Sequence, residues 1–168
     1  MKIAICGAHG VGKTTISKKI SEKFDLEVLP DIVVDAYNMG LEINEGTPIE
    51  TQTWLIGQQM ANEKTRSDFV ADKCIFDYYV YAKALGMDDD VVSVAKKVAT
   101  KTHNYDYIFY IAPEFPIEDD GVRSTDPDFQ ASIDKTYKKF LDDLGINYTQ
   151  LTGTVEDRMN QVLDTVSQ

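Results

Sequence analysis

The sequence is poor in arginine and contains no long hydrophobic run. Its three arginines are Arg66, Arg123 and Arg158, and acidic residues outnumber basic ones, so that the formal net charge is -11. Such a charge makes the phosphate backbone of a nucleic acid an unfavourable partner over most of the surface. No apolar run is long enough to span a membrane and no signal peptide is present, so we expect a cytoplasmic protein.

Cysteine is also scarce: Cys6 and Cys74 are the only two, and both fall in predicted buried strands. We expect them to be small core residues in a reducing compartment, not a disulfide or a metal site. A chain of 168 residues, 43% of them hydrophobic, can form a substantial core but is too short for two. The length therefore predicts a single domain over residues 1–168.

A glycine-rich stretch near the start carries the strongest motif. The run Gly7–Thr14, GAHGVGKT, has the spacing of a phosphate-binding loop: glycine, four residues, then Gly-Lys-Thr. It follows a short apolar run, Lys2–Cys6, and precedes a segment that places Ile16, Ile20 and Phe24 on one helical face. A strand, a glycine loop and a helix form the context in which this motif binds phosphate.

The chemistry of the loop follows from this context. Its glycines allow backbone N–H groups and the positive end of the helix dipole to point at an anion. Lys13 can reach the outer phosphates of ATP, and the Thr14 hydroxyl can ligate Mg²⁺. The His9 side chain is expected to face solvent. The residues predicted to bind ATP here are Gly7, His9, Gly10, Val11, Gly12, Lys13, Thr14 and Thr15.

Strands alternate with helices along the whole sequence. This order predicts a three-layer α/β/α fold with a five-stranded parallel sheet. A capping box at Thr47–Glu50 opens a long helix that is expected to reach about Val70. The expected strands are Lys2–Cys6, Leu26–Leu29, Lys73–Asp77, Tyr107–Ile111 and Ile146–Leu151.

Three side chains follow the carboxyl ends of these strands, where ligands of such sheets bind. Asp31 comes after the second expected strand, Asp77 ends the third, and Arg123 lies in the loop after the fourth. Together with the Gly7–Thr14 loop they predict one site at this edge of the sheet.

The motifs resemble those of a known group of enzymes. The chain is similar to small P-loop kinases of the nucleoside and nucleotide kinase group, including ribosylnicotinamide-kinase-like and thymidylate-kinase-like proteins. The resemblance rests on the loop Gly7–Thr15, on the strand within 105–114 followed by the segment 119–123, DDGVR, and on the turn 151–158. It covers nearly the whole chain and implies the P-loop NTPase fold, with a short lid at about residues 113–127 that carries Arg123.

The resemblance implies three catalytic residues: Lys13, Asp31 and Arg123. Asp31 matches the acid that accepts the proton of the acceptor hydroxyl, although its position also suits a helix cap. Arg123 would close over the transferred phosphoryl group and neutralise its developing charge.

Further roles are implied less specifically. Asp77 matches an acid that holds Mg²⁺ or contacts the acceptor, or it caps a helix; which of Asp31 and Asp77 acts as the base stays open. Arg158 would stack on adenine or pair with nearby acids. Gln58 and Arg66 would line the acceptor pocket.

Two departures bear on the acceptor. Many relatives have Asp-Arg at the end of the third strand, where this sequence is expected to have Asp77-Tyr78, and the arginine that compact relatives carry after the second strand is replaced by valines at 33–34. Fewer cations weaken the case for an acceptor that already carries phosphate. Three tyrosines favour an uncharged ring instead: Tyr78, Tyr79 and Tyr81.

The resemblance therefore implies an ATP- and Mg²⁺-dependent phosphotransferase acting on a small-molecule nucleoside or nucleotide. A kinase acting on a nucleic-acid end or a modified DNA base is a second hypothesis, disfavoured by the acidic charge. A regulatory P-loop ATPase without a small-molecule acceptor is a third. The oligomeric state stays open between a monomer and a homodimer.

Overall fold

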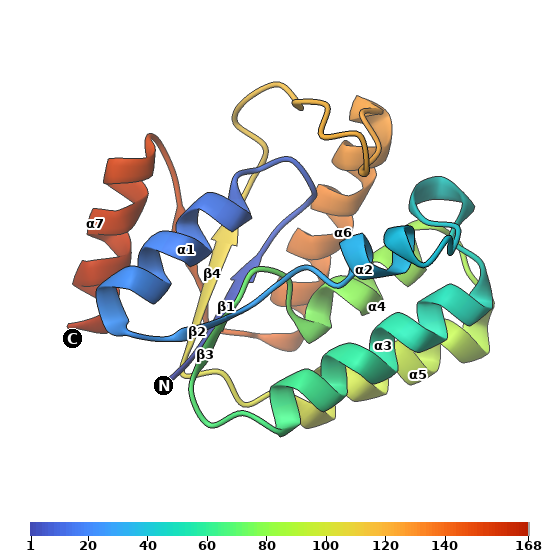
Figure 1. Ribbon diagram of the computed structural model, residues 1–168, viewed down its shortest axis with the longest axis horizontal. Coiled ribbons are helices and arrows are strands. Elements are labelled where there is room, and N and C mark those ends of the chain that lie inside the picture. Colours follow the sequence, from blue (N-terminus) through green and yellow to red (C-terminus); the bar gives the residue numbers. More distant parts are fainter. Residues whose placement is uncertain (168) are drawn as a thin grey trace.

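A parallel β-sheet runs through the centre of the molecule (Figure 1). In the computed structural model, which describes residues 1–167, the sheet has five strands in the order β2-β3-β1-β4-β5. All four pairings are parallel, and Ala4 in the central strand lies opposite Ala71 on one side and Ile108 on the other. The strands are β1 (Lys2–Cys6), β2 (Glu27–Leu29), β3 (Phe69–Ala71), β4 (Tyr107–Ile111) and β5 (Thr149–Leu151).

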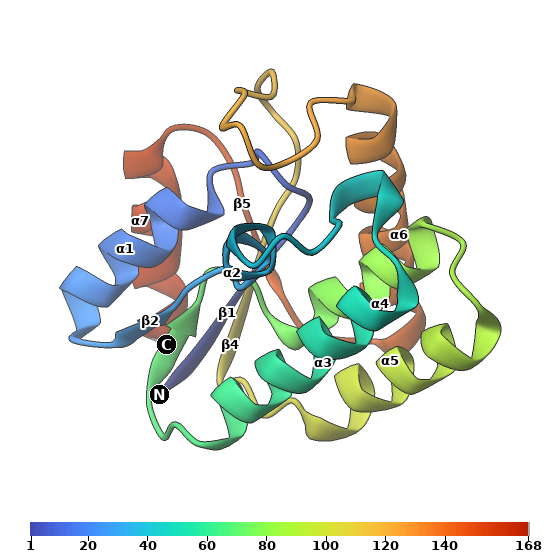
Figure 2. The same ribbon diagram turned by 45° about the vertical axis from the view of Figure 1, so that its right-hand side comes forward.

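Helices cover both faces of this sheet (Figures 1 and 2). One layer consists of α1 and α7, which pack on each other, and the other consists of α3, α4, α5 and α6. The predicted three-layer α/β/α fold is therefore confirmed. The helices are α1 (Lys13–Phe24), α2 (Val33–Asn38), α3 (Ile49–Lys64), α4 (Ile75–Ala84), α5 (Asp89–Thr102), α6 (Pro127–Leu144) and α7 (Val155–Val166), with a 3-10 turn, η1 (Asn44–Gly46), before α3.

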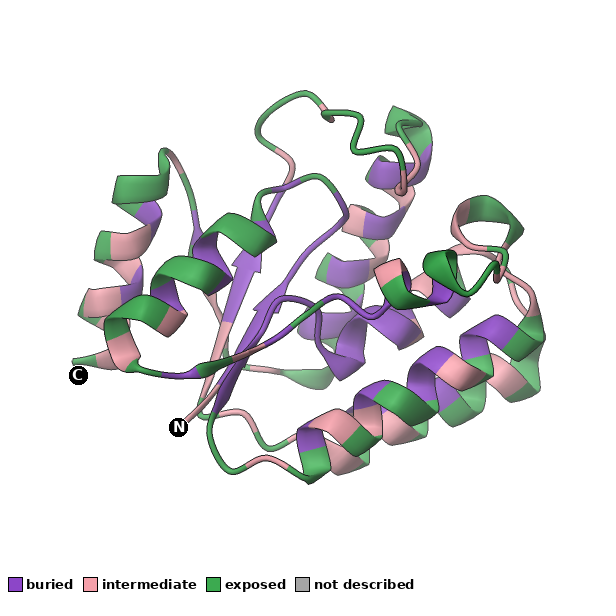
Figure 3. Cartoon of the chain, viewed as in Figure 1, coloured by how far each residue is buried: buried purple, intermediate pink, exposed green. Residues whose placement is uncertain are grey.

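The strands form the core of the domain. Residues of β1 and β3 are almost fully buried because helices cover both sides of the sheet, and Figure 3 shows these strands in the colour of buried residues. The strands consequently read as continuous apolar runs, which is why β1 and β4 were predictable. In residues 1–167 no helix has both the length and the apolar character needed to cross a membrane.

The position predicted for the third strand is wrong. It was expected at Lys73–Asp77, but the strand lies at Phe69–Ala71, and α3 ends at Lys64 instead of near Val70. Cys74 is the N-cap of α4, and the Asp77 carboxylate accepts a hydrogen bond from the Cys74 amide at 2.8 Å. Both segments are short apolar runs that end in an acid, and this capping box assigns the second of them to a helix.

The strand order fixes where a ligand can bind. β1 has β3 on one side and β4 on the other, so the direction of the connections reverses beside β1. In open α/β sheets, ligands bind in the crevice outside the carboxyl ends of the strands at such a point. The loop after β1 and the residue after β3, Asp72, meet there.

Candidate active site

The loop between β1 and α1 has the conformation that the motif requires. Gly7, Gly10 and Gly12 have φ of 137°, 72° and 89°, values that favour glycine, and Gly12 is the N-cap of α1. A side chain at Gly7 would also overlap the carbonyl oxygen of Ile111 at the end of β4. The loop therefore presents backbone N–H groups at a helix N-terminus, the arrangement that binds phosphate.

Lys13 lies across this loop. Its ammonium group donates hydrogen bonds to the carbonyl oxygens of Gly7, at 2.8 Å, and Ala8, at 2.6 Å. Burial lowers the pKa of Lys13, which the nearby carboxylates of Asp77 and Asp72 partly counteract. The positive charge is thus held at the place where the outer phosphates of a nucleotide would lie.

Asp72 is a site residue that sequence reasoning missed. It directly follows β3, is 5% exposed, and accepts a hydrogen bond from the Thr14 hydroxyl at 2.7 Å. A loop threonine beside a strand-ending aspartate is the oxygen pair that holds Mg²⁺ in P-loop proteins, with phosphates and waters completing the coordination. These two side chains fit the ion, although the described residues form no cluster of three or more potential ligands.

Asp77, the predicted metal ligand, lies near Lys13 but is not at the end of β3. It is fully buried in the first turn of α4, where its carboxylate accepts from the Cys74 amide, and burial raises its pKa. The expectation for Asp77 depended on the misplaced strand. The acid that ends β3 is Asp72, five residues earlier in the chain.

Asp31 is the centre of an ionic cluster. Its carboxylate lies 2.9 Å from the Arg123 guanidinium and 3.8 Å from the Lys73 ammonium, and it also accepts from the Val33 amide at 3.0 Å. Burial alone would raise the pKa of Asp31, but Lys73 and Arg123 outweigh it and hold that pKa below its ordinary value. Asp31 therefore both accepts from the first amide of α2 and carries a charge at the site.

Lys73 overturns the expectation that this side of the site lacks cations. Because the strand ends at Ala71, the pair after it is Asp72-Lys73, an acid followed by a cation, and not Asp77-Tyr78. The Lys73 side chain is buried, and its ammonium lies 4.3 Å from the centre of the Tyr81 ring. The number of cations on this side therefore no longer favours an uncharged acceptor.

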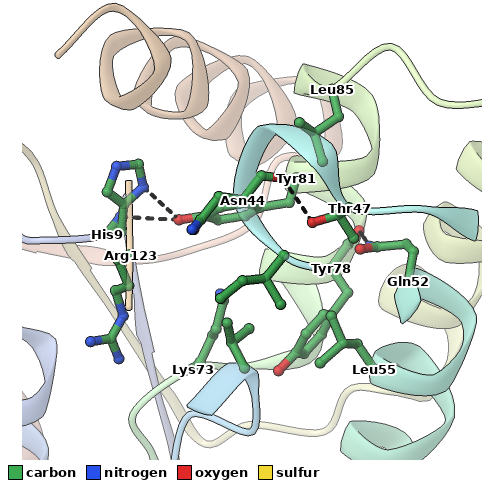
Figure 4. Close-up of a pocket in the computed structure, with 12 residues that line it drawn as sticks. His9, Asn44, Thr47, Gln52, Leu55, Lys73, Tyr78, Tyr81, Leu85 and Arg123 are labelled. Carbon is green, nitrogen blue, oxygen red and sulfur yellow. Dashed lines mark hydrogen bonds between the residues drawn. The ribbon is translucent and has the colours of Figure 1, made fainter. Parts of the chain in front are cut away.

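A small cavity of about 30 Å³, called the acceptor cavity below, opens beside this cluster (Figure 4). Its walls come from α2, η1, α3 and α4, and most of the lining is apolar. Of the three tyrosines expected to stack on a ring, Tyr78 and Tyr81 line it, whereas Tyr79 packs on Phe140. The lining includes Asn44, Thr47, Gln52, Leu55, Tyr78 and Tyr81.

Gln58 and Arg66 do not line this cavity. Gln58 is exposed on α3, where it donates to Asn62, and Arg66 pairs with Glu27 at 2.8 Å. The buried face of α3 instead presents Gln52, which is 1% exposed and donates to the Tyr78 carbonyl oxygen at 2.5 Å. The polar stripe that suggested Gln58 is the solvent face of the helix.

His9 does not face solvent as expected. It is 5% exposed, and its Nδ1 lies 3.0 Å from the Tyr81 hydroxyl, which also accepts from the His9 amide at 3.1 Å (Figure 4). Burial, together with the charges of Lys13 and Lys73, lowers the pKa of His9 to about 4. The imidazole is therefore neutral at pH 7 and serves to join the loop to α4.

This lowered pKa predicts a pH-dependent stability. The unfolded chain binds a proton at His9 near pH 6.5 and the folded chain only near pH 4, so folding is favoured above that range and weakened as pH falls through it. Between pH 7.5 and pH 5 we expect the free energy of unfolding to drop by about 1–2 kcal/mol more in the wild type than in His9→Asn. Urea denaturation at both pH values measures this, and parallel losses in the two proteins would contradict it.

Arg158 lies on the other side of the loop, where its guanidinium donates to the Val11 carbonyl at 2.9 Å and pairs with Glu114 at 3.0 Å. It also lies 5.8 Å from the Phe115 ring. Arg158, Phe115 and Gly153 line an open cleft that continues from Gly12. Of the two predicted roles, pairing with an acid is the contact observed, and stacking on adenine stays a prediction.

The two halves of the site adjoin each other. A polar cavity beside the loop is lined by Lys13, Thr14, Asp31 and Asp72, and it shares four lining residues with the acceptor cavity. The shared residues are His9, Lys73, Tyr81 and Arg123. A group held on the loop and a group held in the acceptor cavity would therefore meet beside the Asp31–Arg123 ion pair.

The fold and the loop define a P-loop nucleotide-binding domain of the α/β class. A family described as "AAA domain" matches residues 2–158, and the chain belongs to this family. A search of the curated proteins found no matching sequence.

Solved structures with the same fold include nucleoside and nucleotide kinases. Deoxyadenosine kinase from M. mycoides with bound dATP has a TM-score of 0.71 and 17% identity, with 100% of both chains covered. Thymidylate kinase from Ehrlichia chaffeensis has a TM-score of 0.70 and 12% identity, covering 100% of this chain and 98% of that one. A NadR protein in complex with NR has a TM-score of 0.81 and 15% identity over 99% of this chain, which spans 52% of that protein. The predicted P-loop kinase-like fold is confirmed.

Proposed function

We propose that the protein is a P-loop kinase that transfers the terminal phosphoryl group of ATP to a hydroxyl group of an uncharged, ring-bearing acceptor of the nucleoside type. The observation that carries this proposal is the shared wall of the two cavities, with Asp31 and Arg123 placed between the phosphate-binding loop and the apolar pocket. A simple ATPase would need no such second pocket.

Each side chain has a task in this reaction. Lys13 and the loop amides would hold the outer phosphates, and Asp31 would orient the acceptor hydroxyl by accepting its hydrogen bond. Arg123 would stabilise the charge that spreads over the transferred oxygens. Mg²⁺ held by Thr14 and Asp72 would supply further charge neutralisation.

The depressed pKa of Asp31 is compatible with this role. A carboxylate that Lys73 and Arg123 keep ionised is a weak base, but phosphoryl transfer passes through a loose transition state that needs orientation more than early proton removal. The reaction therefore rests on positioning and on charge, which this ionic cluster supplies.

The lining of the cavity supports an uncharged acceptor. Beyond Lys73 and Arg123 at the shared wall, both paired with Asp31, the cavity lining contains no Lys or Arg among residues 1–167. A ring could stack against Tyr78 or Tyr81 and form a hydrogen bond with the Gln52 amide. The formal net charge of -11 disfavours a nucleic-acid acceptor.

An acceptor panel with ATP labelled in its terminal phosphoryl group tests the proposal. We expect label transfer to at least one nucleoside, with less transfer to nucleoside monophosphates and to DNA ends. Hydrolysis of ATP that no acceptor changes would instead support a regulatory ATPase, and efficient labelling of DNA ends would support a nucleic-acid kinase. Either result overturns the proposal.

Substitutions of Gln52, on the buried face of α3, and of Gln58, on its exposed face, form a matched pair that tests where the acceptor binds. Gln52→Leu removes a polar group from the cavity wall, so we expect the KM for the acceptor to rise about tenfold, the loss of one hydrogen bond. Gln58→Leu alters the exposed face and should leave the KM unchanged. Steady-state kinetics at saturating ATP measures both, and an equal effect of the two substitutions would contradict the placement of the acceptor.

A further inference from the structure

Asn44, on the opposite wall of the acceptor cavity, contacts the lid segment on both sides of Arg123. The side-chain amide of Asn44 donates to the Val122 carbonyl at 2.8 Å, and its oxygen accepts from the Ser124 amide at 3.2 Å. A single residue thus holds the backbone immediately before and immediately after Arg123.

Asn44 is itself rigidly placed. It has a φ of 63°, in the left-handed region that asparagine tolerates better than most residues, and its carbonyl accepts from both the amide and the hydroxyl of Thr47, at 3.1 Å and 2.7 Å. The adjoining Glu45 accepts a further hydrogen bond from the Ser124 hydroxyl. The turn η1 therefore forms a firm support for the lid.

This support is also a wall of the acceptor cavity. Asn44 and Thr47 line it together with Tyr81 and Arg123 (Figure 4). An acceptor that fills the cavity would touch the same turn that holds the lid, and the lid residue between the two held peptides reaches Asp31 at 2.9 Å.

We propose that Asn44 is a positioning residue that fixes the lid backbone around Arg123 and so couples occupation of the acceptor cavity to the placement of this arginine at the transferred phosphoryl group. This inference rests on the proposed function. Asn44 acts through Arg123 and need not touch the reacting atoms itself. With both flanking peptides fixed to η1, the Arg123 side chain loses less freedom when it engages the phosphoryl group than it would in a lid held only by its own Asp120.

The variant that tests this role most directly is Asn44→Gly. Glycine adopts the observed φ without strain, so this substitution removes the two side-chain hydrogen bonds and leaves the turn intact. Asp25→Gly is the matched control because Asp25, at the end of α1, also has a positive φ of 53° and lies outside the site. We expect kcat to fall about 10- to 100-fold in Asn44→Gly, with the KM for the acceptor changed less than about threefold, and both values to be unchanged in Asp25→Gly.

A double variant separates positioning from general structural support. If Asn44 acts through Arg123, adding Asn44→Gly to Arg123→Ala should cause no further loss of kcat, because the group being positioned is absent. Multiplied losses in the double variant would overturn the positioning role, and so would an unchanged kcat in Asn44→Gly alone.

Hydrogen exchange of the lid tests, without relying on catalysis, whether Asn44 holds the backbone at Val122 and Ser124; we call this pair of contacts the clamp. We expect the Ser124 amide to exchange at least about tenfold faster in Asn44→Gly than in the wild type, because its acceptor is gone. Unchanged exchange would overturn the clamp. A wild-type protein that labels no acceptor would overturn the proposed function, and the exchange result would still decide whether Asn44 holds the lid.

Discussion

Lys13→Ala is expected to lower kcat/KM for phosphoryl transfer by at least about 1,000-fold, the loss of one preorganised cation at the transferred group. The reason is geometric: the Lys13 ammonium is buried and lies within 2.8 Å of two loop carbonyls, so its positive charge is fixed at the loop. Initial rates with labelled ATP and the best acceptor measure the effect.

The control for Lys13 lies on the same helix. Lys18 is exposed on α1 and contacts neither cavity, so Lys18→Ala should retain full activity. Circular dichroism of both variants reports whether the fold persists. Activity within tenfold of the wild type in a folded Lys13→Ala protein would remove the phosphate-binding loop from the reaction.

The second large effect is expected at Arg123. Arg123→Ala should lower kcat about 100- to 1,000-fold while raising the acceptor KM less than about fivefold, because the arginine acts mainly on the transition state. Arg123→Lys should restore part of the loss, since an ammonium keeps the charge but not the planar fork of donors. Rates measured at saturating ATP over a range of acceptor concentrations separate kcat from KM.

Arg66 offers the control for arginine removal. It pairs with Glu27 at the far end of α3, and Arg66→Ala should change kcat less than about twofold, as expected for an exposed ion pair. If Arg123→Ala instead raised KM alone, the arginine would be a binding residue and its role at the transition state would be wrong.

The loop side of the site could be predicted because its signals are local. The Gly7–Thr14 spacing, the apolar strand before it and the helix after it all lie within a short stretch of chain. Asp31 and Arg123 also lie beside this loop as expected, since each follows a strand that was placed correctly, and their catalytic roles stay predictions. The structure brings these two residues to 2.9 Å although they are far apart in the sequence.

The acceptor side could not be predicted from the same kind of signal. Two short apolar runs, Phe69–Ala71 and the one that starts at Cys74, compete for the third strand, and only the capping contact of Asp77 distinguishes them. Choosing the wrong run hid both Asp72 and Lys73. Predicting which residue follows a strand requires the end of that strand to be placed correctly.

Helix phase and tertiary contacts account for the remaining errors. On α3 the polar stripe through Gln58 faces solvent, while Gln52 faces α4, and a weakly amphipathic sequence does not distinguish the two faces. His9 is buried where it contacts Tyr81, and Asn44 contacts the lid through a hydrogen bond from the Ser124 amide. These contacts join segments that the linear pattern does not connect.

The proposed reaction depends on one feature: the amides at the start of α1, with Lys13, form a site for the phosphates of a nucleotide. Calorimetric titration with Mg²⁺ and a non-hydrolysable ATP analogue tests it most directly. We expect one site per chain with a Kd of about 1–100 μM in the wild type and at least about tenfold weaker binding in Lys13→Ala. Absence of binding heat in the wild type at several temperatures, or equal affinity in the two proteins, would contradict it.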